Sequence, residues 1–433
     1  MATKSEVRHA ETGAENVTWN LTDLYSSVED LETALEQASS TAQSFSDQYR
    51  GEVAKLPPAL LAVSLKEFEI LHDRLDKSYT YAFLNWCTNT IAPERGALLQ
   101  KVREAYTRIG QTILFFEIEL LQIQEDDFER LLAEPSVLPF RHYLETLALR
   151  RSHVLTEPEE RILAEKSVTG PGAWSRFFDE TLGAATFRFK GKDLSEQEIL
   201  ALLYESDRST RREAALTFTE GLRSNLRALT YIVNTVLAEK ASDDRIRGYE
   251  NWLASRNISN EISDAAVDAL VTAVTSKFDL VARYYNLKRN LLGLDELYDY
   301  DRYAPINGIE SKYEWGQART LVLESYGRFH PLLEEIAGYF FEKRWIDAGL
   351  SPGKRGGAFS HPAVPEVHPY ILMNFTGNTR DVQTLAHELG HGVHQYLARR
   401  QGSLHANTPL TTSETASVFG EMLVFERLLE TES

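Results

Sequence analysis

The sequence contains one cysteine, Cys87, among 433 residues. A single cysteine allows no disulfide within the chain and no metal site built from several thiolates. Basic residues are also in the minority, because 46 Lys and Arg stand against 64 Asp and Glu, which gives a formal net charge of −18. An acidic surface repels phosphate backbones, so we expect no nucleic acid among the partners of this protein.

Long apolar runs are lacking as well. The stretch 113–123 is among the most apolar, yet Glu117 and Glu119 interrupt it and it is too short to span a bilayer. Residues 1–25 are polar and carry charges throughout, without the apolar core of a signal peptide. These absences predict a cytoplasmic protein that makes no contact with a membrane.

What the sequence does contain is helical periodicity, which predicts a mostly α fold. From about residue 26 to 165 apolar residues recur at helical spacing, for example at Leu61, Leu65, Phe68 and Leu71. Prolines fall between these segments, where they do not break a helix. The clearest strand-like segment is 186–192, which alternates and ends in a turn. We therefore predict a helical N-terminal region, 1–193, and a second region, 194–433.

The segment 353–377 has a different character, because it is rich in glycine and contains a short apolar stretch. Residues 370–375 read as a buried strand. Asn378 and Asp381 then supply an N-cap and a first-turn acid for a helix that follows.

That helix carries His387-Glu388-Leu389-Gly390-His391. Histidines at positions i and i+4 project from one helix face, so they can share one zinc ion. Glu388 lies beside the pair and not between them, a placement that suits a base acting on a zinc-bound water. The alternative is a pair of surface or core histidines next to an unrelated glutamate.

A catalytic zinc ion needs a third protein ligand and one open position. His394 follows on the same helix, but one straight helix cannot easily wrap three ligands around one ion. Glu414 is the better candidate, since it stands near the start of the next predicted helix. Its alternative role is a helix capping box with Thr411. Glu421, two turns further on, is a possible partner for a ligand histidine.

These motifs resemble a known family. HELGHGVH at 387–394 with ETASVFGE at 414–421 resembles the oligoendopeptidase F branch of the thimet oligopeptidase-like zinc peptidases. The resemblance extends to GKRGGAFS at 353–360, PYILMNFTG at 369–377 and NWLASRNISNEI at 251–262. It covers most of the chain from about residue 195 onward, together with a weaker helical N-terminal part.

The resemblance implies a multi-helix metallopeptidase with a small β-sheet beside the active-site helix and a deep substrate channel. It assigns one Zn²⁺ to His387, His391 and Glu414, and water activation to Glu388. It also suggests substrate contacts in the glycine loop and the following strand, at Gly356, Gly357, Ala358, Tyr370, Leu372 and Asn374. The family's transition-state donors come from well beyond the second motif, whereas this sequence ends 19 residues after Glu414. We therefore expect a chain truncated at its C-terminus.

Zinc-dependent hydrolysis of internal bonds in short peptides is the function these observations favour. A zinc carboxypeptidase is one alternative, because some such enzymes share the histidine motif. The other alternative is a catalytically impaired fragment that binds zinc and peptide. The sequence does not indicate an oligomeric state.

Overall fold

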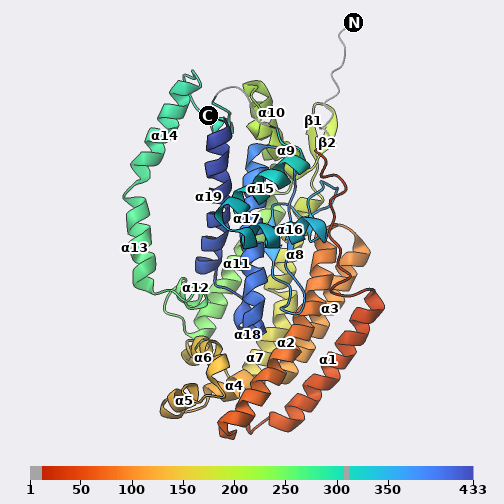
Figure 1. The fold of residues 1–433 in the computed structure, drawn as a ribbon, viewed down its shortest axis with the longest axis vertical. Coiled ribbons are helices and arrows are strands. Elements are labelled where there is room, and N and C mark those ends of the chain that lie inside the picture. The colour runs from red at the N-terminus through yellow and green to blue at the C-terminus, as the bar shows by residue number, and fades with distance from the viewer. Residues whose placement is uncertain (1–11, 307–311, 433) are drawn as a thin grey trace.

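Helices form most of the protein, as the sequence predicts, and the strands form two small sheets in the part of the chain that is described. The computed structural model describes residues 12–306 and 312–432, which Figure 1 traces from red to blue. Within these ranges, no helix combines the length and the apolar character that crossing a bilayer requires.

The N-terminal helices follow the predicted pattern of apolar faces and prolines. Leu61, Leu65, Phe68 and Leu71 are all buried. Pro58 and Pro93 occupy the first positions of their helices, where a missing N–H group costs nothing. The helices of this part are α1 (Val28–Tyr49), α2 (Pro58–Cys87), α3 (Pro93–Ile113), α4 (Phe115–Leu121), α5 (Glu125–Leu132), α6 (Arg141–Ala148), α7 (Glu157–Thr169) and α8 (Pro171–Gly183).

The predicted strand-like segment is confirmed as a hairpin. Strands β1 (Phe187–Phe189) and β2 (Lys192–Leu194) pair in antiparallel fashion. Lys190 and Gly191 join them with positive φ angles of 46° and 86°, as a tight hairpin turn requires. Phe187, Phe189 and Leu194 form a small core of their own with Ile199, Leu202 and Ala214.

Further helices connect the hairpin to the C-terminal part. They are α9 (Glu196–Ala201), α10 (Arg208–Ser224), α11 (Leu226–Arg247), α12 (Ala254–Ser259), α13 (Asp264–Thr275) and α14 (Phe278–Leu291). Figure 1 shows α13 and α14 extending along one side of the molecule, apart from the other helices. Many of their apolar side chains are exposed, such as Leu270 and Phe278.

The C-terminal part combines helices with a three-stranded sheet. Its elements are α15 (Trp315–Phe329), α16 (Pro331–Glu342), β3 (Ile346–Asp347), β4 (Phe359–His361), β5 (Tyr370–Leu372), α17 (Thr379–Ala398), α18 (Ser403–Ala406) and α19 (Leu410–Glu432). The strand order is β3-β5-β4, with β5 parallel to β3 and antiparallel to β4. The buried strand predicted from 370–375 is thereby confirmed, although its regular part ends at Leu372.

One main core joins the two ends of the chain. It contains residues of α1 to α6 together with residues of α15 to α17, α19 and the three-stranded sheet. The boundary predicted at residue 193 falls inside β2, while the main core includes residues from both sides of it. The division into regions 1–193 and 194–433 stays a prediction.

Candidate metal centre

Helix α17 begins where the sequence predicts, at a capping box. The Asn378 side chain accepts a hydrogen bond from the backbone N–H of Asp381 at 2.9 Å. The Asp381 carboxylate in turn accepts from the backbone N–H and the hydroxyl of Thr376, at 2.6 and 2.7 Å. The first bond satisfies one of the donors that a helix start leaves open, and the bonds from Thr376 tie the segment before the helix to its first turn.

The apolar face of α17 is anchored in the main core. Its side chains Val382, Leu385, Ala386 and Leu389 are fully buried. Tyr326 of α15 donates its hydroxyl hydrogen bond to the Ala386 backbone oxygen at 2.6 Å, in a buried position. A helix held in this way offers a rigid base for the side chains on its other face.

Gly390, inside the histidine motif, lets α19 approach α17 closely. A Cβ atom on Gly390 would lie 2.7 Å from the Ala416 backbone oxygen and 2.8 Å from Ser417 Cα. These neighbours are backbone atoms, which cannot turn away as a flexible side chain could. The closeness of the two helices, which carries Glu414 to the histidines, therefore depends on glycine at this position.

Replacing Gly390 by alanine is expected to destabilise the protein by about 1–3 kcal/mol, because the two backbones must separate. The same shift would move Glu414 away from the histidines and weaken metal binding. Chemical denaturation and zinc titration measure the two effects. Gly338→Ala in α16 is the matched control, since nothing lies within 4 Å of its added Cβ. There alanine should stabilise by up to about 1 kcal/mol through helix propensity; equal responses at both positions would contradict the role of Gly390.

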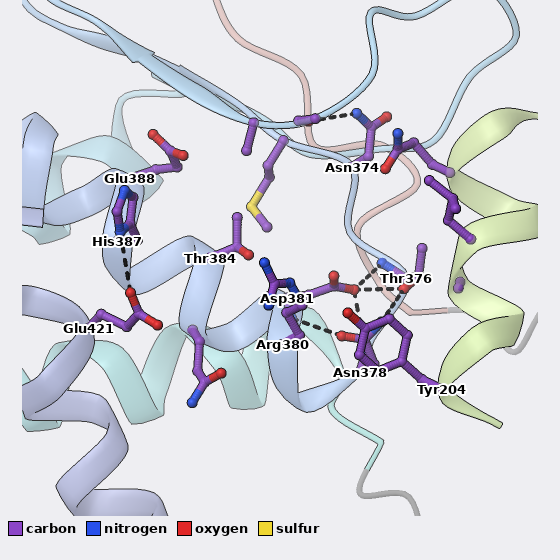
Figure 2. A pocket seen from close by; sticks show the side chains of 17 residues that line it. Tyr204, Asn374, Thr376, Asn378, Arg380, Asp381, Thr384, His387, Glu388 and Glu421 are labelled. Atoms are coloured by element: carbon purple, nitrogen blue, oxygen red, sulfur yellow. Dashed lines mark hydrogen bonds and ion pairs between the residues drawn. The ribbon is translucent and has the colours of Figure 1, made fainter. Parts of the chain in front are cut away.

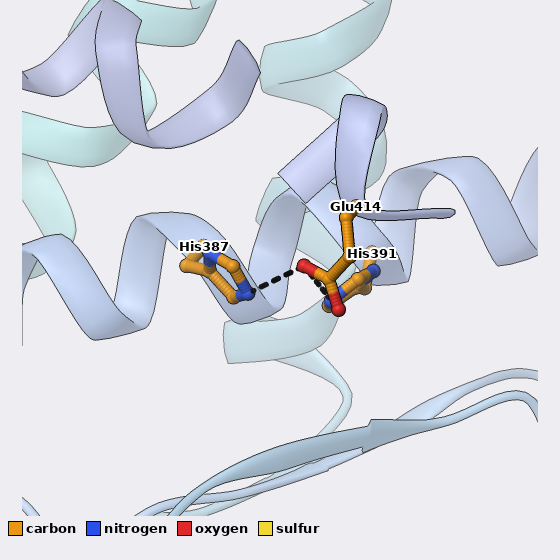
Figure 3. A group of neighbouring side chains, drawn as sticks. All are labelled: His387, His391 and Glu414. Carbon is orange, nitrogen blue, oxygen red and sulfur yellow. Dashed lines mark ion pairs between the residues drawn. The ribbon is translucent and has the colours of Figure 1, made fainter. Parts of the chain in front are cut away.

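Figure 3 shows His387, His391 and Glu414 converging from the two helices. Glu414 Oε2 lies 3.4 Å from His387 Nε2 and 3.6 Å from His391 Nε2. One ligand atom from each residue falls within 4.8 Å of the others. Atoms that bind one ion at about 2.1 Å with tetrahedral angles are about 3.4 Å apart, so this donor set fits a zinc-sized cation.

Each of the two histidines has a further hydrogen-bond partner besides Glu414. Glu421 Oε2 lies 3.3 Å from His387 Nδ1. A carboxylate only accepts, so Nδ1 carries the hydrogen and the Nε2 lone pair stays free for a metal. His391 makes a hydrogen bond with the Ser413 backbone, and burial lowers the pKa of His391, which favours the neutral form that binds metals.

Glu388 is the buried acid of the group, with 7% of its surface exposed. Burial raises the pKa of Glu388 to about 8, and the nearby Glu414 carboxylate adds to the rise. A hydrogen bond from the Ser360 backbone on β4 opposes it. A carboxyl group in such surroundings holds a proton readily, as a general acid–base residue must.

The alternative role of Glu414, a capping box with Thr411, does not form. Helix α19 already begins at Leu410, and the Thr411 hydroxyl donates to the Asn260 backbone oxygen at 2.9 Å. The Glu414 carboxylate instead accepts from the Ser417 hydroxyl at 2.9 Å, and half of its side chain remains exposed. Its position is therefore not explained by helix capping.

Two cavities meet at these residues. The larger, of about 480 Å³, runs from His387 along the start of α17 towards α9, and Figure 2 shows the side chains around it. The smaller, of about 400 Å³, lies towards His391, Gln395 and Glu414. Both are lined by Ala358, His387 and Glu388, so the candidate metal centre separates two spaces.

The predicted substrate contacts fall into two groups, those at or near the larger cavity and those buried in the sheet. Gly357, Ala358 and Asn374 line the larger cavity, and Gly356 packs against side chains of α9. Asn374 also donates to the Arg355 and Gly357 backbone oxygens at 3.0 and 2.9 Å, so it shapes the loop.

Tyr370 and Leu372 belong to the other group, because both are completely buried. Strand β5 is paired on both sides, with β3 and with β4, so it offers no edge to a peptide. The two edge strands of this sheet are β3 and β4. Direct substrate contact by Tyr370 and Leu372 is therefore a prediction that this sheet topology argues against.

Arg380 and Tyr204, which also line the larger cavity, are not among the residues predicted from the sequence. A signal for Arg380 was present, since it lies seven residues before His387 and thus on the same helix face. Tyr204 follows α9, almost 200 residues earlier in the chain, and no pattern in the sequence connects it to the motif.

Comparison with known proteins gives two family matches. Residues 201–433 match the model of peptidase family M3, and residues 119–187 match the model described as oligopeptidase F. The chain is 28% identical over 429 residues to group B oligopeptidase PepB of Streptococcus agalactiae, which covers 96% of the chain and 70% of the relative. It is 30% identical over 436 residues to oligopeptidase PepF of Bacillus subtilis, which covers 97% of the chain and 63% of that relative.

A solved structure shares the fold. The oligoendopeptidase-F of Enterococcus faecium aligns with a TM-score of 0.64 and 20% identity, over 94% of this chain and 68% of the other. The mostly helical fold predicted from the sequence is thus confirmed by a related structure as well.

Proposed function

The chain belongs to peptidase family M3, and from this membership we propose that it is a zinc-dependent endopeptidase that cleaves internal bonds of short oligopeptides. The observation that carries the proposal is the meeting of His387, His391 and Glu414 beside the buried Glu388. The chain spans 63–70% of the length of the two curated relatives described above, so the activity is proposed for this chain and not transferred.

His387, His391 and Glu414 would hold the metal, and we propose that it is a single Zn²⁺. Two imidazoles and one carboxylate form a donor set typical of catalytic zinc, and three protein ligands leave a position open. When bound, zinc would supply Lewis acidity, which lowers the pKa of water and polarises a carbonyl group. Glu421 would keep the His387 ring in the tautomer that presents Nε2.

Glu388 is the proposed general acid–base residue. Its carboxylate would accept a proton from the attacking water and later donate it to the nitrogen of the departing amine. The Ser360 N–H bond and the surrounding burial hold the carboxyl group in place between these two steps. In the overall reaction the water oxygen forms a bond to the carbonyl carbon, the C–N bond breaks, and the proton held by Glu388 passes to the amine.

The proposed place where a peptide backbone pairs is Ala358, directly before the edge strand β4. The backbone of Ser360 faces α17. The Gln395 side chain donates to the Ser360 backbone oxygen at 3.2 Å, and the Ser360 N–H donates to Glu388. Ala358 lies two residues earlier, so its backbone faces the same side of the strand, and it lines both cavities. A peptide lying along this edge would cross the metal centre.

Hydrolysis of an internally quenched peptide of about eight residues tests the proposal directly. We expect internal cleavage by the zinc-loaded protein and its loss when a chelator removes the metal. Mass spectrometry of the products separates the alternatives. Stepwise loss of single C-terminal residues would indicate a zinc carboxypeptidase, and tight peptide binding without cleavage would indicate a protein that only binds zinc and peptide.

A further inference from the structure

The larger cavity has one basic side chain in its lining. Among the described residues around it, Arg380 is the only Lys or Arg. The smaller cavity on the other side of the metal centre has none in its described lining. The two sides of the candidate site therefore differ in charge, and the difference comes from one residue.

Arg380 is also the charged side chain of this cavity that has no fixed partner. Among the residues that the structure describes, no hydrogen bond or ion pair involves the Arg380 side chain. The neighbouring carboxylates are engaged elsewhere, since Asp381 accepts from Thr376 and Glu421 bonds His387. An exposed guanidinium inside a concave space, without an ion pair to these carboxylates, is available to a ligand.

Helix geometry places Arg380 at a defined distance from the metal centre. Residues 380, 384, 387 and 391 lie on one face of α17, and Figure 2 shows Arg380, Thr384 and His387 along the cavity. The seven residues between Arg380 and His387 correspond to about 10 Å along the helix axis. An extended peptide advances about 3.4 Å per residue, so this spacing equals about three peptide residues.

Tyr204 provides a second polar group on the facing wall of the cavity. It belongs to the short helical turn after α9, and its ring stacks on Tyr303 with centroids 4.6 Å apart. Burial raises the pKa of Tyr204 to about 12, and the positive charge of Arg380 opposes this rise. The Tyr204 hydroxyl thus stays protonated at neutral pH and can donate a hydrogen bond to an anion near Arg380.

We propose that Arg380 is a specificity-determining residue that binds a peptide carboxylate about two to three residues from the cleaved bond. The inference rests on the proposed function, because it names a substrate class for the same site. The carboxylate can belong to an Asp or Glu side chain or to the C-terminus of a short peptide. Both present the same planar pair of oxygens, which a guanidinium can bind with two parallel hydrogen bonds.

Because the protein is strongly acidic, a preference for carboxylate-bearing peptides at this cavity would depend on Arg380. The chain carries a formal charge of −18, and the described lining of the larger cavity includes the carboxyl groups of Asp381, Glu388 and Glu421. Without Arg380 the described lining of this cavity would hold no Lys or Arg to offset these carboxyl groups. An incoming carboxylate would then be repelled, whereas a neutral peptide would be little affected.

Peptide binding to zinc-loaded Glu388→Gln protein tests the proposal without cleavage. The probes are fluorescent heptapeptides with a C-terminal acid or amide, and with Glu, Gln or Lys at each position in turn. We expect either the peptide with a C-terminal acid or one of the peptides with an internal Glu to bind at least about ten times more tightly than its neutral counterpart. Adding Arg380→Gln should remove this preference and leave the neutral peptides unchanged.

Two further variants sharpen the result. Arg380→Glu should reverse the preference towards Lys, and Arg223→Gln, an exposed change on α10, should alter nothing. Equal affinities for acidic and neutral peptides, an equal loss for both in Arg380→Gln, or no binding of any probe would overturn the inference. Hydrolysis of the neutral amidated peptide by the unaltered protein reports on the proposed function separately, because that peptide does not need Arg380.

Discussion

Replacing Glu388 by glutamine is expected to lower kcat/KM for peptide hydrolysis by about 10²–10⁴-fold, the usual contribution of general acid–base catalysis. Glutamine has nearly the same shape, but it can neither accept the proton of the attacking water nor return it to the leaving amine. The carboxyl group of Glu388 is not among the converging ligand atoms. Metal content and affinity should therefore stay as they were, and the loss should appear in kcat.

The aspartate variant provides a graded control for this result. Glu388→Asp keeps the carboxyl group but withdraws it by one methylene, so its activity should fall between those of the glutamine variant and the unaltered protein. Metal analysis of all three proteins accompanies the kinetics. Hydrolysis that survives Glu388→Gln at full rate would eliminate the proposed mechanism.

Replacing Glu414 by glutamine should weaken zinc binding by more than about a hundredfold. This loss exceeds the usual effect of changing a residue that only hydrogen-bonds a metal ligand. The amide lacks the negative charge that completes the set of two neutral imidazoles. The fold should persist, because half of the Glu414 side chain is exposed and the Ser417 hydroxyl, which bonds its carboxylate, can also bond the Glu414 backbone oxygen. Peptide hydrolysis should be lost unless zinc is added in large excess.

Glu426→Gln is the matched control, since it removes the same charge from an exposed position of the same helix, α19. Zinc titration with a competing chelator compares the variants, and circular dichroism shows whether each stays folded. Equal zinc affinity in Glu414→Gln and in Glu426→Gln would remove Glu414 from the ligand set.

The parts of the site that depend on local spacing could be predicted from the sequence. The positions of His387, Glu388 and His391 follow from helical periodicity, and the N-cap at Asn378 follows from residue type alone. The spacing of Glu421 to Glu414 predicts a possible partner for a ligand histidine, without saying which one, and in the structure Glu421 Oε2 lies 3.3 Å from His387 Nδ1. Gly390, within the same short motif, leaves room for the close approach of α19.

Contacts between distant segments could not be predicted in this way. Thr411 and Glu414 have capping-box spacing, but Asn260, about 150 residues earlier, takes the Thr411 hydroxyl. The apolar segment at 370–375 indicates a buried strand, yet nothing local shows that it lies in the middle of its sheet with β4 at the edge. Tyr204 comes from another region of the chain, so its place in the cavity could not be predicted from the local sequence either.

The central claim is that His387, His391 and Glu414 hold one metal ion. Anomalous X-ray scattering at the zinc edge, measured on crystals of the zinc-loaded protein, tests it most directly. We predict one strong peak within about 2.1 Å of both Nε2 atoms and of a Glu414 oxygen. A peak elsewhere, or none between these three side chains at saturating zinc, would contradict the account.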